Sequence, residues 1–325
     1  MDQNHERILS IILLKNDLQM IMNYDQKQYK YQAQNIVSLD IPMLQKKILV
    51  FIRLTEVVPI AICIAIDGIV SNNQIQDCEF VHLIGAKSSC FELTNTPCCI
   101  CSLSDVAVAS CQTHFPKDFL CVSINIGYHL TMSISKNGEY YVGKNGYSPL
   151  LDYVTFIAKN GFNTARAKCA ESSLMSVEFS FDVVQQLSSE TNNMVSTRVD
   201  IASSYFGLIL AMVLNLFKPN VIQLSGRSLH IYNYYSQSIY IAKQYTTVPF
   251  HFSNTINGFT EKTLLSEECK IMLSKSDHDC YFLYLLNSIG VIRIEDPAIM
   301  QWIQSSRMIH PFSLYIVYPS HWVDV

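Results

Sequence analysis

The chain has 325 residues, of which 49% are apolar and only 15% are charged, and its net charge is −4. These values exclude a disordered chain and suit two domains of about 110–200 residues each. They also count against binding of nucleic acid through the protein's own surface, because proteins of that class usually carry a basic surplus.

Cysteine usage and hydropathy indicate the compartment. The eleven cysteines are odd in number and irregularly spaced, which favours free thiols in a cytoplasmic protein over a disulfide framework. The polar N-terminus lacks a secretory apolar core. The richest apolar runs, Val57–Ile66 and Phe206–Leu214, stop short of the roughly 18–20 residues that cross a membrane. We therefore expect a cytoplasmic protein with no membrane partner.

Strand-like segments dominate the first third of the chain. Ile8–Leu14 and Leu18–Tyr24 flank a turn-capable triplet and predict a hairpin. Ile60–Ile66 and Cys98–Leu103 are short apolar runs that are typical of buried strands. Met43–Leu54 fits either a helix end or a strand.

A helix is predicted over Val106–Gln112, which is rich in small apolar residues. Ser104 and Asp105 stand at its start, where side-chain oxygens accept hydrogen bonds from free N–H groups. A second series of predicted strands and helices begins after Pro116.

Helix and strand signals alternate after this proline, which indicates α/β layers. The expected strands are Phe119–Ile126, Leu130–Ser135, Tyr140–Val142, Val221–Leu224 and Val248–Phe252, and the expected helices are Ser172–Ser188, Val199–Phe217 and Ser236–Gln244. Asn137-Gly138 predicts a tight hairpin turn. The long helix is predicted because several apolar side chains share one helical face, namely Ile201, Tyr205, Leu208, Met212 and Leu216.

One segment carries a family resemblance. Phe119–Gly146 reads FLCVSINIGYHLTMSISKNGEYYVGKNG. It resembles the ROK family (repressors, open reading frames and sugar kinases), in which a strand precedes a glycine-rich IGTGIGxGI loop and an NGxLYxGxNG hairpin. The matching positions are Ile126, Gly127, Asn137, Gly138, Tyr141, Gly143, Asn145 and Gly146. Segments 65–70, 104–107 and 215–222 match in the right order, so the resemblance covers roughly residues 7–270.

The resemblance implies an α/β protein with the two-lobed, actin-like ATPase (ribonuclease H-like) fold and a central cleft. We expect residues 1–116 to form the N-terminal lobe and residues 117–275 the C-terminal lobe. Residues 276–325 form a tail of unclear role that we expect to pack back on the first lobe. The family also implies a homodimer.

The ATP-binding elements of the family are degraded in this chain. The first phosphate loop, D-x-G-G-T, falls near ILLKN at 12–16, which has neither the glycines nor the aspartate. The second loop keeps Gly127 but carries Tyr128 and His129 where glycines let the backbone approach phosphate. The family's third nucleotide-binding element is a run of three glycines after the strand that begins at Val221, and only Gly226 remains of it here. We therefore regard Gly127 and Gly226 as remnants of a cofactor site and expect no cofactor.

The structural zinc site of the family is also missing. Of its one His and three Cys ligands only Cys169 remains, and a closed zinc site needs four. The run Cys98–Cys101 could bind a metal, but neighbouring strand residues point to opposite faces, which favours core packing. We expect no bound metal.

Part of the family's sugar pocket is retained. Asp105 matches the catalytic base that takes a proton from the sugar hydroxyl, and the alternative is that it only caps the helix. Glu171 matches a sugar-binding glutamate, and the alternative is a favourable charge at a helix N-terminus. Ser104 and Gly68 complete the candidate substrate-binding set. The family's E-x-G-H sugar contacts fall at 150–153, where Leu150 and Tyr153 replace the Glu and the His.

Other candidates are weaker. His129 and His114 could suggest acid–base chemistry, but no nucleophile stands in a recognised motif, and scattered histidines are usually structural or surface residues. Tyr232–Tyr235 could stack on a sugar or a nucleic acid, but we favour a role in packing between a loop and a helix.

Three functions remain open at this point. The first is a non-catalytic ROK-like protein, a pseudo sugar kinase that binds a sugar-like ligand or a protein partner. The second is an active hexose or amino-sugar kinase with divergent loops, which would need ATP and Mg²⁺. The third is a ROK-type transcriptional regulator, although a first strand near Arg7 leaves no room for the N-terminal winged helix of such regulators. We favour the first.

Overall fold

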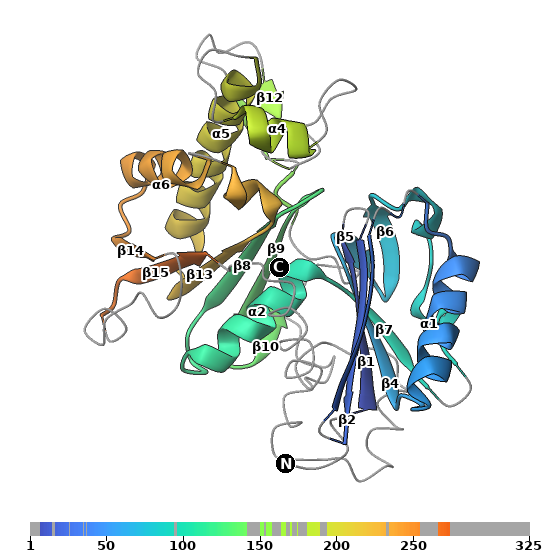
Figure 1. Cartoon of the computed structure of the whole chain (residues 1–325). Coiled ribbons are helices and arrows are strands. Elements are labelled where there is room, and N and C mark those ends of the chain that lie inside the picture. The colour runs from blue at the N-terminus through green and yellow to red at the C-terminus, as the bar shows by residue number, and fades with distance from the viewer. Residues whose placement is uncertain are drawn as a thin grey trace. The chain divides into compact units, whose positions relative to one another are not determined.

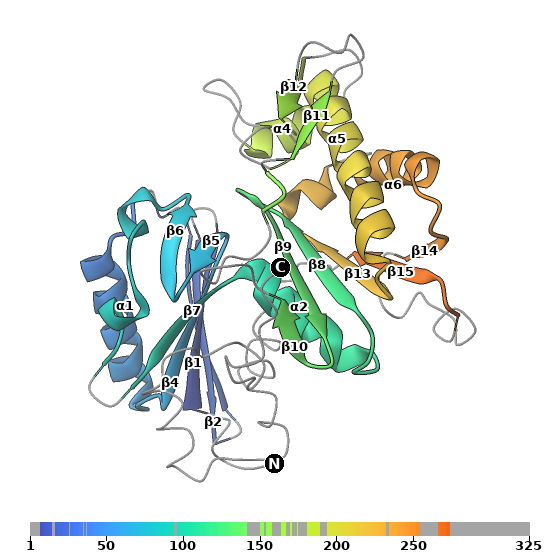
Figure 2. The ribbon, with the colours of Figure 1, turned by 180° about the vertical axis from the view of Figure 1, so that it is seen from behind.

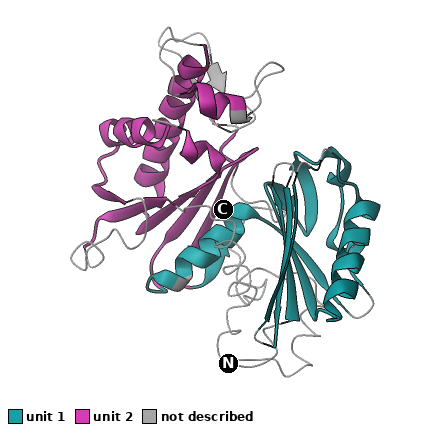
Figure 3. Cartoon of the chain, viewed as in Figure 1, with its two compact units in different colours: residues 1–117, 138–148, 277–325 teal, residues 118–137, 149–276 magenta. Residues whose placement is uncertain are grey.

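The computed structural model describes residues 7–14, 17–25, 27–34, 36, 38–93, 96–141, 150–152, 154–157, 164–166, 170, 174, 181–188, 194–231, 234–253 and 266–273. The chain divides into two compact units (Figure 3). Unit 1 comprises residues 1–117, 138–148 and 277–325, and unit 2 comprises residues 118–137 and 149–276. The expected tail at 276–325 lies outside the described residues.

Unit 1 is built on a five-stranded mixed sheet with the strand order β3-β2-β1-β4-β7 (Figure 1). Its strands are β1 (Ile8–Leu14), β2 (Asp17–Tyr24), β3 (Lys27–Gln34), β4 (Ala61–Ile66) and β7 (Cys98–Ser102). The expected hairpin of β1 and β2 is confirmed, and β1, β4 and β7 run parallel. Strand β3 was not predicted; it is an edge strand whose side chains alternate between exposed and half-buried.

Both faces of the central strands are buried, which explains why these strands are apolar throughout. On one face, Leu9 and Ile11 join a core cluster with Leu44, Ile48 and Phe51 of α1 (Ile41–Thr55). On the other face, Ile8 and Ile12 pack in a second cluster with residues at the start of α2 (Leu103–His114).

Residues 43–54, whose sequence fits either a helix end or a strand, belong to helix α1. Asp40 caps α1 by accepting a hydrogen bond from the Met43 N–H at 2.8 Å, and a proline stands in the first turn, where a missing N–H costs nothing. The remaining elements of unit 1 are the hairpin of β5 (Gly68–Ser71) and β6 (Gln74–Cys78) and the short helices η2 (Val81–Leu83) and η3 (Ser88–Cys90).

The six-stranded sheet has the strand order β10-β9-β8-β13-β15-β14. Its strands are β8 (Cys121–Ile126), β9 (Leu130–Lys136), β10 (Glu139–Tyr141), β13 (Val221–Ser225), β14 (Phe250–Ser253) and β15 (Cys269–Leu273). The predicted tight turn between β9 and β10 is confirmed, because Asn137 and Gly138 both have positive φ, at 56° and 78°.

Helices cover one face of this sheet (Figure 2). The other elements of unit 2 are α4 (Phe181–Leu187), α5 (Met194–Phe217), α6 (Tyr234–Tyr245), the short helix η5 (Arg227–His230) and a small hairpin of β11 (Thr155–Ile157) and β12 (Thr164–Arg166). Val122, Ile124 and Ile222 pack against α5 and α6 in one core cluster. Several alternate residues of the same strands are polar but also buried, including Ser123 and Gln223.

Helix α5 starts five residues earlier than expected. It is long and apolar enough to cross a membrane by length and composition, and 56% of its apolar window is buried inside the protein. A core helix passes the same test, so this is weak evidence for a membrane span. The buried side of α5 includes Val199, Phe206 and Val213, whereas the stripe of residues that predicted the helix lies on the less buried side.

Alkaline pH is expected to destabilise the protein through its buried thiols. Burial raises the pKa of Cys78 and of Cys269 to about 12, from an ordinary value of 9.0. Between these two values the unfolded chain loses both protons while the folded chain keeps them. The free energy of unfolding then falls by about 1.4 kcal/mol per pH unit for each thiol. This stability is fully present below about pH 9 and is lost as the pH rises toward 12.

Urea denaturation at about pH 8 and about pH 10 measures this loss. The double variant Cys78→Ala/Cys269→Ala serves as the control. It starts from a lower stability because cavities replace the thiols, but its stability should fall less steeply with pH. An equal fall in both proteins would contradict the assignment.

Candidate functional site

The carboxyl edge of the five-stranded sheet gathers three of the predicted residues. Ile66 at the end of β4 is paired with Ser102 at the end of β7. Gly68 follows β4 by two residues and Ser104 follows β7 by two, so the two segments leave the sheet side by side, together with Asp105. The carboxyl edge of parallel strands is the usual place for ligands in open α/β sheets.

Asp105 takes part in a capping box at the start of α2. The helix begins at Leu103, three residues earlier than expected, and its N-cap is Ser102. The Asp105 carboxylate accepts hydrogen bonds from the N–H of Ser102 at 3.1 Å and from its hydroxyl at 2.7 Å. The Ser102 hydroxyl oxygen in turn accepts the Asp105 N–H at 3.2 Å. Asp105 therefore helps to cap α2, and its side chain is only half-buried.

Ser104 and Gly68 have structural roles beside it. The Ser104 hydroxyl is completely buried and lies 2.9 Å from the Ser102 hydroxyl. Gly68 lies where β5 approaches β6 most closely, because a Cβ there would stand 2.4 Å from the carbonyl oxygen of Asp77. The close approach of β6, rather than contact with a ligand, is sufficient to require glycine at 68.

The two glycines that we regard as remnants of a cofactor site lie close together in unit 2. Strands β8 and β13 pair in parallel up to Asn125 and Ser225, whose side chains are hydrogen bonded at 3.1 Å. Gly226 follows directly, with φ at 110°, and a Cβ there would stand 2.3 Å from the carbonyl oxygen of Ile126. Gly127 directly follows Ile126, so both glycines lie where β8 and β13 end.

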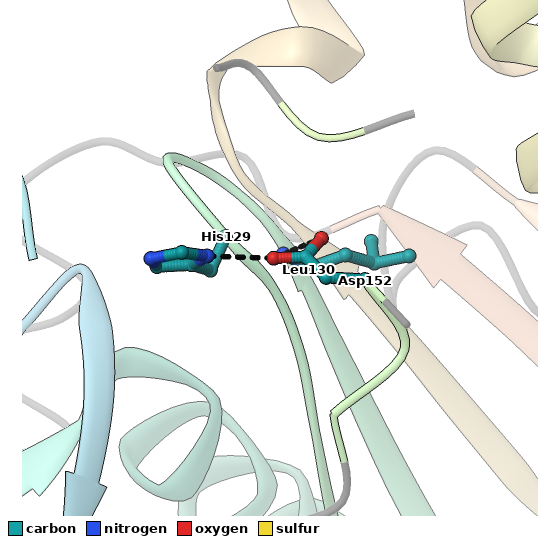
Figure 4. A network of polar contacts seen from close by, with 3 residues as sticks. All are labelled: His129, Leu130 and Asp152. Carbon is teal, nitrogen blue, oxygen red and sulfur yellow. Dashed lines mark hydrogen bonds and ion pairs between the residues drawn. The ribbon is translucent and has the colours of Figure 1, made fainter. Parts of the chain in front are cut away.

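A hydrogen-bonded pair occupies the turn that follows Gly127. The Nδ1 atom of His129 lies 2.6 Å from Oδ2 of Asp152, and the other carboxylate oxygen accepts the N–H of Leu130 at 2.9 Å (Figure 4). The side chains of His129 and Asp152 are only 13% and 9% exposed. The segment that carries Asp152 is fixed to β9 because the N–H of Leu151 donates to the carbonyl oxygen of Leu130 at 3.1 Å.

Two backbone donors of this turn, those of Gly127 and Leu130, are already used within the protein. The N–H of Gly127 donates to the carbonyl oxygen of His129, and the N–H of Leu130 donates to Asp152. The ring of Tyr128 stands edge-on to that of His129, with 4.9 Å between the ring centres. A phosphate group needs free N–H donors and tolerates no carboxylate among them. The described residues of this turn therefore do not fit the phosphates of ATP.

Several predicted residues lie outside the part of the chain that the structure describes. They are Lys15, Asn16, Gly143, Asn145, Gly146, Tyr153, Cys169, Glu171 and Tyr232. Among the described residues, no group of three or more His, Cys, Asp and Glu side chains is placed to hold a metal ion. Cys98 and Ile100 face one core cluster of unit 1, whereas Cys99 and Cys101 face the other, as alternation along the strand requires.

Sequence reasoning missed Asp152 and discounted His129. The two residues are 23 positions apart, and Asp152 falls where the family has a glycine, so no motif links them. A signal was present all the same. His129 replaces a glycine in a loop that must be tightly packed, and a buried imidazole needs a polar partner.

The chain is similar to known proteins in its structure. No protein-family profile matches the chain, and no curated protein does. A ROK family protein from Streptococcus pneumoniae TIGR4 in complex with sucrose is similar, with 14% identity, a TM-score of 0.62, and coverage of 93% of this chain and 99% of that chain. A ROK family glucokinase from Streptomyces griseus in complex with glucose and AMPPNP has 8% identity, a TM-score of 0.62, and coverage of 86% and 98%.

A regulator is similar to the same degree. This ROK family transcriptional regulator, a homolog of the Escherichia coli MLC protein, has 14% identity, a TM-score of 0.61, and coverage of 86% of this chain and 77% of that chain. Kinases and a regulator thus share one architecture with this chain, so the architecture does not separate their functions. The chain has the fold of the ROK family, the two-lobed actin-like ATPase fold.

Proposed function

We propose that this protein binds a sugar-like ligand and does not transfer phosphate from ATP. The observation that carries the proposal is the turn between β8 and β9, where the Asp152 carboxylate accepts the Leu130 N–H and the His129 ring stands in place of glycine. Phosphoryl transfer depends on backbone donors that hold the phosphates, and the loss of one such donor costs about 100–1000-fold in rate.

The sugar side of the proposal rests on the other unit. Asp105 stands at the carboxyl edge of the five-stranded sheet, and it is half-buried. Structural neighbours were solved with sucrose and with glucose. A carboxylate at such an edge can accept hydrogen bonds from sugar hydroxyls, which makes a neutral sugar the ligand class of choice. The cytoplasm is the compartment that we propose for this activity.

An ATP titration tests the first half of the proposal. With and without Mg²⁺, calorimetry should detect no binding at micromolar ATP. A coupled assay with glucose, mannose, N-acetylglucosamine and N-acetylmannosamine should detect no phosphate transfer. About one turnover per second that disappears in Asp105→Asn would instead establish the sugar-kinase alternative.

A melting screen tests the second half. A sugar that binds only the folded protein raises its melting temperature, by an amount that grows with ligand concentration. The shift should be lost in Asp105→Asn. Ser102→Ala is the matched control, because it removes the same helix cap, worth about 1 kcal/mol, but leaves the carboxylate in place. The proposal fails if neither sucrose nor any of the four sugars named above shifts the melting temperature. It also fails if both variants respond as the wild type does.

A further inference from the structure

One edge strand of the described sheets differs from the others. The two large sheets end in β3 and β7 and in β10 and β14. Strands β10 and β14 have only three and four residues. Strand β7 has five residues, all buried, and the N–H of its Ile100 donates to the side chain of Asn73 at 3.2 Å. Strand β3 has eight residues, and every one of them is exposed or half-buried. Proteins usually keep edge strands short or covered, because an open edge can pair with another chain.

Strand β3 is regular along its whole length. It pairs with β2 without a register shift, from Lys27 opposite Tyr24 to Gln34 opposite Asp17. It contains no proline, which would interrupt a further strand. Every second residue of an edge strand directs its N–H and C=O away from the neighbouring strand. Among the described residues, the backbone of β3 is hydrogen bonded only to that of β2. The outer side of β3 can therefore accept a further strand.

The charge around this edge is positive. Lys27 and Lys30 on β3 are both exposed. Neither β3 nor α1, which packs on the same sheet, contains an acidic residue, although the whole chain has a net charge of −4. The acidic residues that flank these two elements in the sequence are Asp25, Asp40 and Glu56. The edge is thus complementary to a negatively charged strand.

The two faces of β3 offer different contacts. Tyr29 and Tyr31 lie on the face that packs beside α1, at the margin of a core cluster, and both are half-buried. The ammonium group of Lys47 on α1 fixes Tyr31 by donating to its hydroxyl at 3.1 Å. Lys30 lies on the opposite face, because side chains alternate along a strand. A further strand would therefore lie beside two aromatic rings on one face and beside a lysine on the other.

We propose that β3 binds an extended acidic segment of a partner protein, which adds a strand to the five-stranded sheet. In this mode of recognition, main-chain hydrogen bonds supply affinity and alternate side chains supply specificity. Acidic side chains at every second position of the segment face Lys30, and the apolar side chains between them face Tyr29 and Tyr31. The lysines also oppose pairing of β3 with a second copy of itself, because two such edges bring like charges together.

A synthetic peptide tests the binding. The probe has eight residues, as β3 has, and glutamate alternates with valine along it. Fluorescence anisotropy of the labelled peptide should detect binding that weakens as salt is added, because salt screens exposed charges. The same peptide with methylated backbone nitrogens keeps its charges but cannot pair as a strand, so it should not bind. A peptide with lysine in place of glutamate should not bind either.

A charge reversal on β3 tests the specificity. Lys30→Glu should weaken binding of the glutamate peptide about fivefold. It should also allow binding of the lysine peptide, a gain that a merely damaged protein would not show. Lys218→Glu is the matched control, because it makes the same change at an exposed lysine of unit 2. This variant should bind the glutamate peptide as the wild type does.

Hydrogen exchange locates the bound peptide. The amides of β3 that point away from β2 should exchange more slowly when the glutamate peptide is present, and those that donate to β2 should change little. The proposal is overturned if the glutamate peptide does not bind at about 1 mM, or if exchange in β3 is unchanged. Equal binding of the methylated peptide also overturns it, because attraction between charges alone would then explain the binding. None of these results bears on sugar or ATP binding.

Discussion

Replacing Gly226 with alanine is expected to lower the free energy of unfolding by about 2–6 kcal/mol. Its backbone, with φ at 110°, lies in a region that only glycine occupies without strain. The new Cβ would also stand 2.3 Å from the carbonyl oxygen of Ile126, which belongs to the neighbouring strand and cannot move freely. Since folded domains are stable by only about 5–15 kcal/mol, urea denaturation should show a large fall in the unfolding midpoint.

Gly85→Ala separates strain from collision. Gly85 also has positive φ, at 87°, but the nearest atom to its Cβ would be Nε2 of Gln74 at 3.9 Å, so the cost is the backbone strain alone, about 1–2 kcal/mol. A loss in Gly226→Ala no larger than that in Gly85→Ala would show that the ends of β8 and β13 are not packed as closely as described.

Asp152→Ala is expected to lower the free energy of unfolding by about 2–4 kcal/mol. The variant leaves the His129 ring and the Leu130 N–H without the carboxylate that both now contact, at 2.6 and 2.9 Å, in a buried place. Asp152→Asn keeps the shape and one oxygen acceptor, so it should lose about half as much. Urea denaturation of the two variants measures the difference.

The same pair of variants reports on the turn itself. In Asp152→Ala the N–H of Leu130 is released and the negative charge is gone, so weak affinity for inorganic phosphate should emerge where the wild type has none. Equal phosphate affinity in wild type and variant would contradict the idea that the carboxylate occupies the place of an anion.

The sequence predicted most elements that bury apolar side chains, and the reason is physical. The run of β4 is apolar throughout because both faces of its sheet are covered, and the apolar residues of β8 and β13 alternate with polar residues that are also buried. The edge strand β3 was missed because its sequence, KQYKYQAQ, is polar, and it is held as a strand by its pairing with β2. The pattern of one strand alone does not contain that partner.

Strand β15 was missed for a different reason. It has Lys270 at its second position, a residue that argues against a buried strand. In the structure this side chain is fully buried, its ammonium group donates to the carbonyl oxygen of Ser266, and it stands over the ring of Phe119 at 5.5 Å. Burial lowers the pKa of Lys270. Whether such a lysine is buried in a strand depends on its contacts in the folded protein and not on the local sequence pattern.

Local sequence patterns could likewise predict one part of the candidate site but not the other. Ser104, Asp105 and Gly68 could be placed at one sheet edge because each follows a predicted strand. Gly127 and Gly226 each follow a predicted strand, but that these strands are neighbours is known only from the pairing of β8 with β13. The pair of His129 and Asp152 could not be predicted, because the link depends on how the segment after Leu150 folds back on β9, which no local pattern specifies.

The pairing of β8 with β13 also determines the order in which the chain can fold during synthesis. All strands of the five-stranded sheet are complete by Ser102, whereas the side chain of Asn125 must wait for Ser225, 100 residues later. At about 5–20 residues per second, the ribosome needs about 5–20 s to add those residues. During that interval the β8–β9 hairpin has an unpaired apolar edge, and pairing between such edges joins nascent chains. Slow translation of residues 126–225 should therefore increase aggregation, and a holdase chaperone that covers the hairpin should suppress it.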